Sequence, residues 1–327
     1  MKKKKLNNNI LLKPHLLLLL LSTLVIAMTS LFVGVAQAPF NAIITGSPEA
    51  WLTLTTSRIP RLLSLILAGS GLAICGVILQ QVVQNRFAEP ATTGGLDAAK
   101  LGVLIAVIHW PELGLQGKAG AALLFCLLTS TLFVLILRQI RIKNTILVPV
   151  IGLMYGGVLS AIADFYAYQH NLMQNMQAWL LGDFSKVIQG NYEILYFVVP
   201  IVLVTYLFAQ RFTIIGMGES FASSLGLNYF TMIASALFIV SLCVAAIMVT
   251  VGSLPFVGLV IPNLVAMRYG DNIQQTLPIS ALYGALFLIV CDIFGRLIIF
   301  PFEIPIGLTS GCFGGLLFLF ILRKSKR

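Results

Sequence analysis

Long apolar runs separated by short polar segments form the dominant pattern of this 327-residue chain. A helix that crosses a bilayer needs about 20 apolar residues, whereas strands of a membrane β-barrel alternate polar and apolar positions. The pattern therefore predicts an all-α polytopic membrane protein that forms one transmembrane domain over residues 1–327. Ten helices are expected, at 14–36, 60–81, 94–109, 117–138, 144–168, 191–210, 228–250, 256–269, 277–299 and 305–322.

Composition and charge agree with a membrane protein. Hydrophobic residues make up 58% of the chain and charged residues only 10%, whereas a soluble domain is about half apolar and a quarter charged. Much of the net charge of +10 lies in two short basic tails, 1–13 and 323–327. Basic clusters beside apolar spans are typical of cytoplasmic ends. Since no basic recognition module for nucleic acid is present, we expect no nucleic-acid partner.

The positions of lysine and arginine also orient the spans. Ten spans place both termini on one side, and the basic tails make this side the cytoplasm. The N-terminus resembles a signal peptide, but the 21 uncharged residues from Leu16 to Ala36 exceed the about 7–15 of a secretory apolar region, so we expect an uncleaved first span. The inner loops then carry the segment "RQIRIK" (138–143), Arg211 and Arg268, and the outward segments 37–57, 110–116 and 170–190 carry only Lys186.

Three arginines run against this charge bias, because they fall at outer ends of predicted spans. Arg58 and Arg61 begin the second span, where Pro60 suits the first helical turn. Arg296 lies near the end of the ninth span. Either these side chains extend to the interface as isolated cations, or together they receive carboxylates of a partner, for which the planar guanidinium is well suited.

Three carboxylates near the outer side need an explanation as well. Asp292 precedes Arg296 by four residues, so a helix places both on one face. Glu303 either pairs with one of the arginines or caps the N-terminus of the last span. Asp164, near the outer end of the fifth span, reads as a lone carboxylate and as a candidate for proton coupling.

Two glycine- and proline-containing segments interrupt the helical pattern, at 84–95 and 251–263. Irregular backbone within a membrane must lie against protein or a water-lined cavity. The two segments follow spans of opposite direction, which favours an inverted repeat of the kind found in transporters.

The loop 212–227 is the third unusual segment. Its part "GMGESFASSLGL", Gly216 to Leu227, is small, polar and bracketed by glycine. It is either a short amphipathic helix that docks a cytoplasmic partner or an ordinary interfacial loop.

Signals for catalysis and for bound cofactors are missing from the sequence. There is no GxxxxGK[ST] nucleotide loop and no GxSxG motif, so the chain is not expected to be an enzyme. The three histidines lack metal-binding spacing, and we expect no metal or cofactor on this chain. The cysteines lack CxxC spacing and lie in apolar runs, so we expect small core residues at Cys75, Cys126, Cys243, Cys291 and Cys312.

Five long motifs, in order, resemble one family. They are "RIPRLL" (58–63), "GLAICGVILQQVVQNRFAEP" (71–90), "GSLPFVGLVIPN" (252–263), "LPISALYGALFLIVCDIFGR" (277–296) and "EIPIGLTSGCFGGLLFLFIL" (303–322). The chain resembles, from about residue 15 to 323, the permease subunits of bacterial ABC importers for iron–siderophore complexes, a family that includes vitamin B12 and haem permeases.

The resemblance implies a ten-helix fold like that of the vitamin B12 permease, a type II ABC importer fold. It implies a second permease subunit, two ATPase subunits that bind ATP and Mg²⁺, and a periplasmic or lipid-anchored siderophore-binding protein. A heterodimer of permeases is favoured over a homodimer. The expected location is the bacterial cytoplasmic membrane, in contact with its lipids.

The resemblance also assigns roles to residues of this chain. Docking of the binding protein carries over to Arg58, Arg61 and Arg296. Coupling to the ATPase carries over to Gly216, Met217, Gly218, Glu219, Ser220, Phe221, Ala222, Ser223, Leu225 and Gly226. Structural or gating motifs carry over to Gln80, Asn85, Ala88, Pro90, Gly252, Gly258, Pro262, Asn263, Asp292, Glu303 and Pro305.

Two departures from the family pattern bear on the cargo. Arg86 and Phe87 replace a usual Pro-Leu pair, and Asn263 replaces a common histidine. The stretch "NRFAEPATTGGLDAAKLG" (85–102) resembles instead a subgroup for catecholate-type siderophores, such as the petrobactin, vibriobactin, enterobactin and anguibactin systems. Import of a ferric siderophore is therefore expected. The alternatives are haem or vitamin B12 as cargo, an ion-coupled secondary transporter with a proton site at Asp164 or Asp292, and an integral-membrane enzyme or structural subunit.

Overall fold

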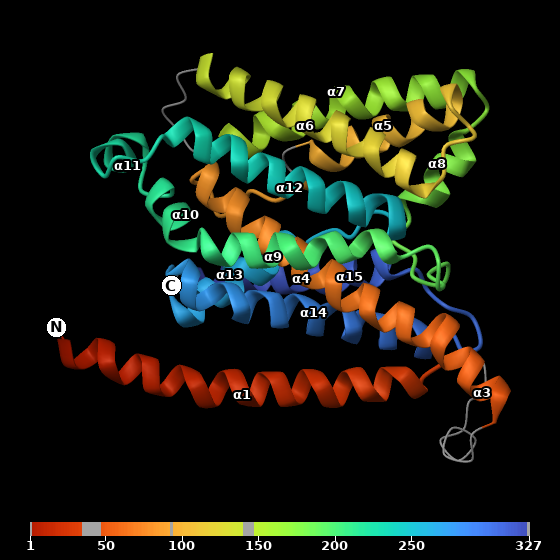
Figure 1. The fold of residues 1–327 in the computed structure, drawn as a ribbon, viewed down its shortest axis with the longest axis horizontal. Helices are drawn as coiled ribbons and strands as arrows, with labels where there is room; N and C mark the ends of the chain where they lie inside the picture. The colour runs from red at the N-terminus through yellow and green to blue at the C-terminus, as the bar shows by residue number, and fades with distance from the viewer. Residues whose placement is uncertain (1, 35–46, 92–93, 140–146, 326–327) are drawn as a thin grey trace.

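The computed structural model describes residues 2–34, 47–91, 94–139 and 147–325, and helices account for most of them (Figure 1). Residues 37–46 of the first predicted outward segment, the basic segment beyond residue 139 and the last two residues lie outside these ranges. The helices are, in chain order, α1 (Lys2–Phe32), α3 (Pro48–Thr53), the π-helix η1 (Leu54–Arg58), α4 (Ile59–Val82), α5 (Gly95–His109), α6 (Leu115–Gln139), α7 (Leu147–Gln169), α8 (Met173–Leu180), the 3-10 helix η3 (Glu193–Phe197), α9 (Val198–Leu207), α10 (Ala209–Ile215), α11 (Glu219–Ser224), α12 (Tyr229–Val251), α13 (Val257–Tyr269), α14 (Ile273–Leu297) and α15 (Ile306–Ser325).

The predicted all-α polytopic fold is confirmed. Six helices among the described residues are long and apolar enough to cross a membrane, and a seventh is formed if Glu193–Leu207 and α10 count as one span bent by 66°. Two shorter apolar helices, Leu16–Phe32 and Val257–Tyr269, coincide with the first and eighth expected spans. The count of ten spans stays a prediction. The six long helices are Pro48–Val82, Leu115–Phe133, Val150–Gln169, Tyr229–Val251, Ile273–Leu297 and Ile306–Arg323.

Helix α4 lies at the centre of the bundle, where it contacts α12, α13 and α14. Glycines allow two of these crossings to be very close. A Cβ at Gly69 would lie 2.4 Å from the carbonyl oxygen of Gly284 on α14, and one at Gly76 would lie 1.9 Å from that of Gly258 on α13. Small residues at such crossings let helix backbones approach within the membrane. Gly69 and Gly76 therefore allow α4 to pack closely against α14 and α13.

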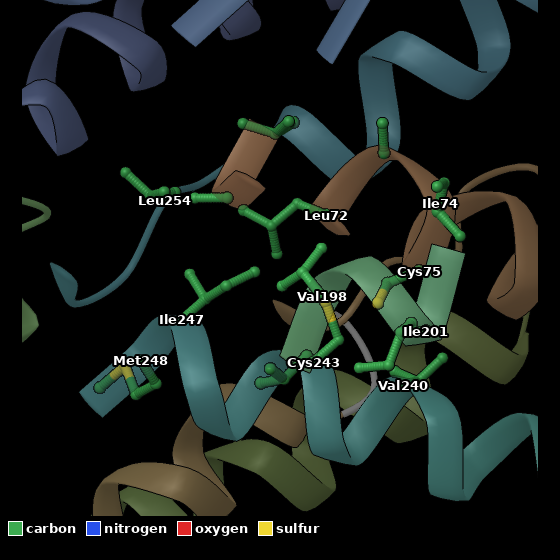
Figure 2. Packing of buried hydrophobic residues seen from close by; sticks show 14 of the residues in the cluster. Leu72, Ile74, Cys75, Val198, Ile201, Val240, Cys243, Ile247, Met248 and Leu254 are labelled. Carbon is green, nitrogen blue, oxygen red and sulfur yellow. The ribbon is translucent and has the colours of Figure 1, made fainter. Parts of the chain in front are cut away.

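Apolar side chains of α4, α9 and α12 fill the space around this central helix (Figure 2). Leu72 and Cys75 of α4 lie among residues such as Val198, Cys243 and Ile247. The expectation that the cysteines are core residues is confirmed for Cys75, Cys126, Cys243 and Cys291, and it is wrong for Cys312, which is exposed on α15. In a membrane helix an uncharged residue can lie either on the packed face or on the exposed face. Hydropathy alone therefore does not show whether such a residue is buried.

The chain between α7 and η3 contains a helix that hydropathy did not predict. The sequence of α8, MQNMQAWL, mixes polar and apolar residues over only eight positions. The segment that follows α8 closes over the end of α12. Asp183 N donates to Val251 O (2.9 Å), Ser253 N donates to Leu180 O (3.2 Å), and Gly307 N donates to Gly182 O (2.9 Å).

The two ends of the bundle carry different segments. In Figure 1, α11 lies at the same end as the start of α1 and the end of α15, whereas α3 lies at the opposite end. The sequence assigns the end with both chain termini to the cytoplasm. By that assignment α11 faces the cytoplasm, and the start of α4 faces outward.

Candidate functional site

Residues at the end of α1, in α3, η1, α4 and α14, and in the segment before α15 line a cavity of about 130 Å³ at the end of the bundle that carries α3. We call this cavity the arginine pocket. It brings together all three arginines that the sequence placed on the outer side. Its lining residues are Ser30, Val33, Gly34, Thr53, Ser57, Arg58, Arg61, Leu62, Arg296 and Glu303.

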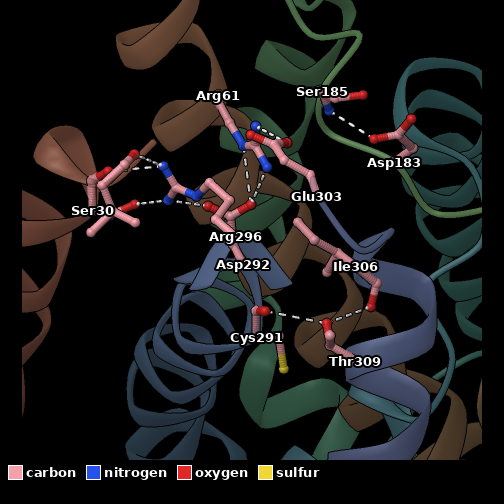
Figure 3. Close-up of polar contacts among 11 residues, drawn as sticks. Ser30, Arg61, Asp183, Ser185, Cys291, Asp292, Arg296, Glu303, Ile306 and Thr309 are labelled. Atoms are coloured by element: carbon pink, nitrogen blue, oxygen red, sulfur yellow. Dashed lines mark hydrogen bonds and ion pairs between the residues drawn. The ribbon is translucent and has the colours of Figure 1, made fainter. Parts of the chain in front are cut away.

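Arg61 joins two carboxylates across the pocket (Figure 3). Its Nε and Nη2 both donate to Oδ1 of Asp292, at 3.0 and 2.7 Å, and its Nη1 donates to Oε2 of Glu303 at 2.8 Å. Asp292 is fully buried, whereas 28% of the Glu303 side chain is exposed. Of the two roles expected for Glu303, pairing with an arginine is the one confirmed. Pro305 follows it directly before α15, and its carbonyl accepts a bond from Leu308 N at 3.0 Å.

Arg296 is buried beside the same aspartate. Its Nη2 donates to Oδ2 of Asp292, so the expected pair at four-residue spacing is confirmed. The guanidinium also donates to the end of α1, from Nη2 to Ser30 Oγ at 2.7 Å and from Nη1 to the carbonyl oxygens of Ser30 (3.1 Å) and Val33. Within the described part of the chain, Nε of Arg296 is buried and has no hydrogen-bond acceptor.

Arg58 contacts the same helix end. Its Nη1 donates to the carbonyl oxygen of Leu31. A π-helical turn, η1, ends at Arg58 and runs directly into α4, with Pro60 in the first turn of α4 as expected. Such turns widen the helix locally and are frequent at functional sites. Here the turn places Arg58 and Arg61 in one cavity.

The sequence did not reveal the acceptors that α1 supplies. Three of them are backbone carbonyls, those of Ser30 and Leu31 in the last turn of α1 and that of Val33 just after it. Carbonyls at the end of a helix have no partner within their own helix. A backbone carbonyl has no residue-type signal. Ser30, whose hydroxyl accepts from Arg296, lies in an uncharged apolar span and gave no signal either.

The predicted docking element at the other end of the bundle is a helix, α11. Gly218 (φ 107°) precedes it and Gly226 (φ 76°) follows it, both with backbone conformations that favour glycine. Met217, Phe221 and Leu225 recur every four residues and are 45–61% exposed, whereas Ala222 is buried beneath them. Of the residues that the family resemblance assigned to coupling, Gly216, Met217 and Gly218 precede α11, Glu219, Ser220, Phe221, Ala222 and Ser223 belong to it, and Leu225 and Gly226 follow it.

Short contacts connect this element to the long helices. A Cβ at Gly216 would lie 1.8 Å from Oε1 of Gln81, so the Gln81 side chain at the end of α4 lies directly against Gly216. Gln84 Nε2 donates to the carbonyl oxygen of Ile215 at 3.5 Å, and Gln210 Nε2 donates to Oε1 of Gln274 on α14 at 2.9 Å. Since α4 and α14 also carry Arg61 and Arg296, the same two helices connect both ends of the molecule.

The two segments that interrupt the helical pattern lie against each other. Gln80 Nε2 donates to Gly258 O at 3.5 Å, and Asn263 Nδ2 donates to Arg86 O at 2.7 Å. Pro90 packs on Gly258, where an added Cβ would lie 3.1 Å from the proline ring. Irregular backbone is thus covered by protein, as membrane segments require. The remaining motif residues of these segments are Asn85, Ala88, Gly252 and Pro262.

The segment after α4 carries two charged residues to which the sequence assigned no role. Arg86, which replaces a usual proline, donates from Nη2 to both carboxylate oxygens of Asp271 at 3.0 Å. This exposed pair ties the segment to the start of α14. Glu89 is buried, and burial raises the pKa of its carboxyl to about 7, while a hydrogen bond from the backbone of Leu259 acts in the opposite direction.

The interpretation of Asp164 as a lone carboxylate is wrong. Lys100 of α5 is buried, and its Nζ donates to Asp164 Oδ1 at 2.7 Å and to Ser160 Oγ at 2.9 Å. The partners lie 64 residues apart in the sequence, so spacing did not reveal them. Among the described residues, no group of three or more His, Cys, Asp or Glu side chains could hold a metal ion.

Known proteins resemble the chain over most of its length. It is 53% identical to the ferric-anguibactin transport system permease protein FatD of Vibrio anguillarum, over 92% of this chain and 96% of that protein. It is 45% identical to the petrobactin import system permease protein YclN of Bacillus subtilis, over 93% and 96%.

The fold has a counterpart among solved structures. A metal-chelate type ABC transporter in an inward-facing conformation superposes with a TM-score of 0.81 at 25% identity, over 95% of this chain and 99% of that one. Residues 18–324 match the FecCD transport family. The long motifs, the helical bundle and these matches agree that the chain belongs to the FecCD transport family.

Proposed function

We propose that this chain is the transmembrane permease subunit of an ABC importer that carries a ferric siderophore across the bacterial cytoplasmic membrane. The family and the names of two relatives, which import anguibactin and petrobactin complexes, support this cargo. A catecholate-type siderophore is the favoured ligand of the binding protein. The permease itself forms a path for the intact chelate and breaks no bond.

The single observation that carries the proposal is the arginine pocket. Three guanidinium groups meet two carboxylates around a cavity of about 130 Å³ at the end of the bundle that the sequence assigns to the outside. Guanidinium groups bind carboxylates with strong, directional bonds. A loaded binding protein that inserts an acidic side chain here docks on Arg58, Arg61 and Arg296.

The energy for transport comes from two separate ATPase subunits, which bind ATP and Mg²⁺, since this chain has no nucleotide motif. Helix α11 is the proposed contact for one of them. Phe221 of this helix forms an exposed row with Met217 before it and Leu225 after it, and this row suits an apolar groove. Movement of α11 then reaches the long helices through Gln81 and Gln274, which contact the segment around it.

A second permease subunit completes the assembly, and a heterodimer is the favoured arrangement, with a homodimer as the alternative. Both termini lie in the cytoplasm. The ion-coupled alternative needs a carboxylate that exchanges protons, and both candidates are engaged with cations. Asp164 pairs with Lys100, and Asp292 pairs with Arg61 and Arg296. This pairing favours the importer.

The test is uptake of radioactive iron into proteoliposomes that contain the permeases, the ATPase subunits and the binding protein. We expect uptake of the ferric siderophore to require ATP on the side of the membrane that carries the ATPase subunits. Uptake should stop when these subunits are omitted. Haem and vitamin B12, offered with their own binding proteins, serve as alternative cargoes. Uptake that persists without the ATPase and follows a proton gradient would contradict the proposal.

Docking is tested by charge reversal. Changing both Arg58 and Arg61 to Glu should weaken the stimulation of ATPase activity by the binding protein. Replacing the acidic docking residues of the binding protein by basic ones should restore it. Normal stimulation in the double variant would show that the pocket is not the docking site.

A further inference from the structure

The arginine pocket already contains acceptors that belong to this chain. Glu303 pairs with Arg61 at 2.8 Å at the exposed side of the pocket. The last turn of α1 accepts from Arg58 through Leu31 and from Arg296 through Ser30 and Val33. Each guanidinium that could receive a partner's carboxylate is therefore engaged with an internal acceptor.

The internal acceptors differ in how firmly they are held. Asp292 is fully buried and bonds to both Arg61 and Arg296, so it is a fixed part of the pocket. Glu303 lies in the segment between α14 and α15 and keeps 28% of its side chain exposed. The α1 acceptors lie at the end of a helix that lies along one edge of the bundle (Figure 1), where it contacts mainly α14.

The charges leave room for another anion. Three guanidinium groups face two carboxylates, so the pocket has one cation in excess. Nε of Arg296 is buried without an acceptor among the described residues. A buried donor without an acceptor is unfavourable, and a carboxylate forms stronger bonds to guanidinium than a backbone carbonyl does.

We propose that the arginine pocket is self-occupied, and that the carboxylate of a docking partner enters it by exchange with Glu303 and with the last turn of α1. This inference rests on the docking role proposed above. It adds that the partner's carboxylate competes with the pocket's own acceptors for the arginines. Docking by exchange frees the end of α1 and the segment before α15. Binding at the outer face then changes how α1 is held against α14.

The competition predicts an unusual sign, because removing a residue of the pocket should strengthen binding. Ser30→Ala deletes the hydroxyl that accepts from Arg296 at 2.7 Å. Glu303→Gln removes the charge that competes for Arg61. Each variant should lower the Kd of the loaded binding protein by about threefold to tenfold, the range expected for one hydrogen bond to a charged group exchanged for another. Ser30→Thr, which keeps the hydroxyl, should bind like the parent.

Two matched variants control for other effects. Thr29→Ala removes the neighbouring hydroxyl of α1, which is exposed and donates within its own helix, to Ile26 O at 2.8 Å. Glu49→Gln removes another exposed carboxylate in the first turn of α3, and so reports the general loss of negative charge. Neither is expected to change the Kd appreciably.

The measurement uses the complete permease–ATPase complex in lipid nanodiscs, titrated with the siderophore-loaded binding protein. Unchanged or raised Kd values in Ser30→Ala and Glu303→Gln would overturn the exchange. If Glu303→Gln fails to assemble, Ser30→Ala alone decides. Arg61→Gln separates the two proposals. If Arg61→Gln leaves the Kd unchanged, the docking role itself fails. If it weakens binding while the other variants do not tighten it, only the exchange fails.

Discussion

The arginine pocket and helix α11 are surfaces at opposite ends of one bundle, and they are built in different ways. The pocket joins residues that are far apart in the sequence, such as Arg61 and Asp292, which are separated by 231 positions. Helix α11 is local. It is six residues long and lies between two glycines with positive φ, and the exposed apolar row around it, Met217, Phe221 and Leu225, spans nine consecutive positions.

In the proposed function, the two surfaces receive different partners. A charged pocket attracts an acidic partner over a distance and accepts it only where counter-charges match. An apolar row binds by excluding water and by shape, and it is effective when it is held rigidly. The arginine pocket is therefore suited to a partner that binds transiently. The surface around α11 is suited to a partner that stays bound and transmits a conformational change.

Breaking the pocket should have the largest effect on the protein itself. Asp292→Asn leaves Arg296 buried without its carboxylate and leaves the partly buried Arg61 with Glu303 alone, which should cost about 3–5 kcal/mol in the free energy of unfolding. Thermal unfolding in detergent measures the loss. The matched control is Asp271→Asn, which breaks the exposed pair with Arg86 and should cost less than about 1 kcal/mol. If both variants lose the same free energy of unfolding, then the buried ion pairs of the arginine pocket stabilise the protein no more than the exposed pair does.

Trimming α11 should affect a partner and spare the fold. Phe221→Ala removes the central side chain of the exposed row and should weaken association with the ATPase by about 2 kcal/mol, the size of an interface hot spot. Co-purification of the ATPase at graded dilution measures it. Ser224→Ala, an exposed residue of the same helix to which no coupling role is assigned, is the control. Loss of binding-protein docking in Phe221→Ala, with the ATPase still bound, would contradict the division between the two surfaces.

The sequence predicted the local surface better than the distant one. The glycine joints and the short helix were visible in "GMGESFASSLGL", because the information lies within twelve neighbouring residues. Topology placed Arg58, Arg61 and Arg296 on one side. It did not give their internal acceptors, because ion pairs between distant helices depend on helix packing, and backbone carbonyls of α1 carry no residue-type signal.

The same limit explains the errors inside the bundle. Asp164 looked isolated because Lys100 meets it only when α5 packs on α7. Helix α8 was missed because its eight residues lack a continuous apolar run. Cys312 was assigned to the core because hydropathy reports the composition of a span and not which face of the helix is covered. Long helices and their order were predictable, since continuous apolar runs along the chain mark them.

Stiffness of α11 is tested at its glycine joint. Gly226 has φ 76°, a conformation that costs other residues about 1–2 kcal/mol but that asparagine tolerates better. Gly226→Ala should therefore reduce the number of siderophores transported per ATP hydrolysed, and Gly226→Asn should retain more of it. Gly157→Ala, in α7, is the control, because nothing lies within 4 Å of the added Cβ. If all three variants transport the same number of siderophores per ATP hydrolysed, then the backbone conformation at Gly226 does not matter for transport.

Raising the salt concentration should have the smallest effect, and it should weaken association at the arginine pocket more than association at α11. The screening length falls from about 10 Å at 0.1 M to about 3 Å at 1 M salt, so the association rate of the binding protein with the pocket should fall by about threefold or more over this range. Association of the ATPase through the apolar row of α11 should change less, because burial of apolar surface does not depend on charge. Arg61→Gln should flatten the salt dependence of the first rate and leave the second unchanged. If both rates fall equally, and Arg61→Gln alters neither slope, then charge does not distinguish the outer surface from α11, and the contrast between them reduces to geometry.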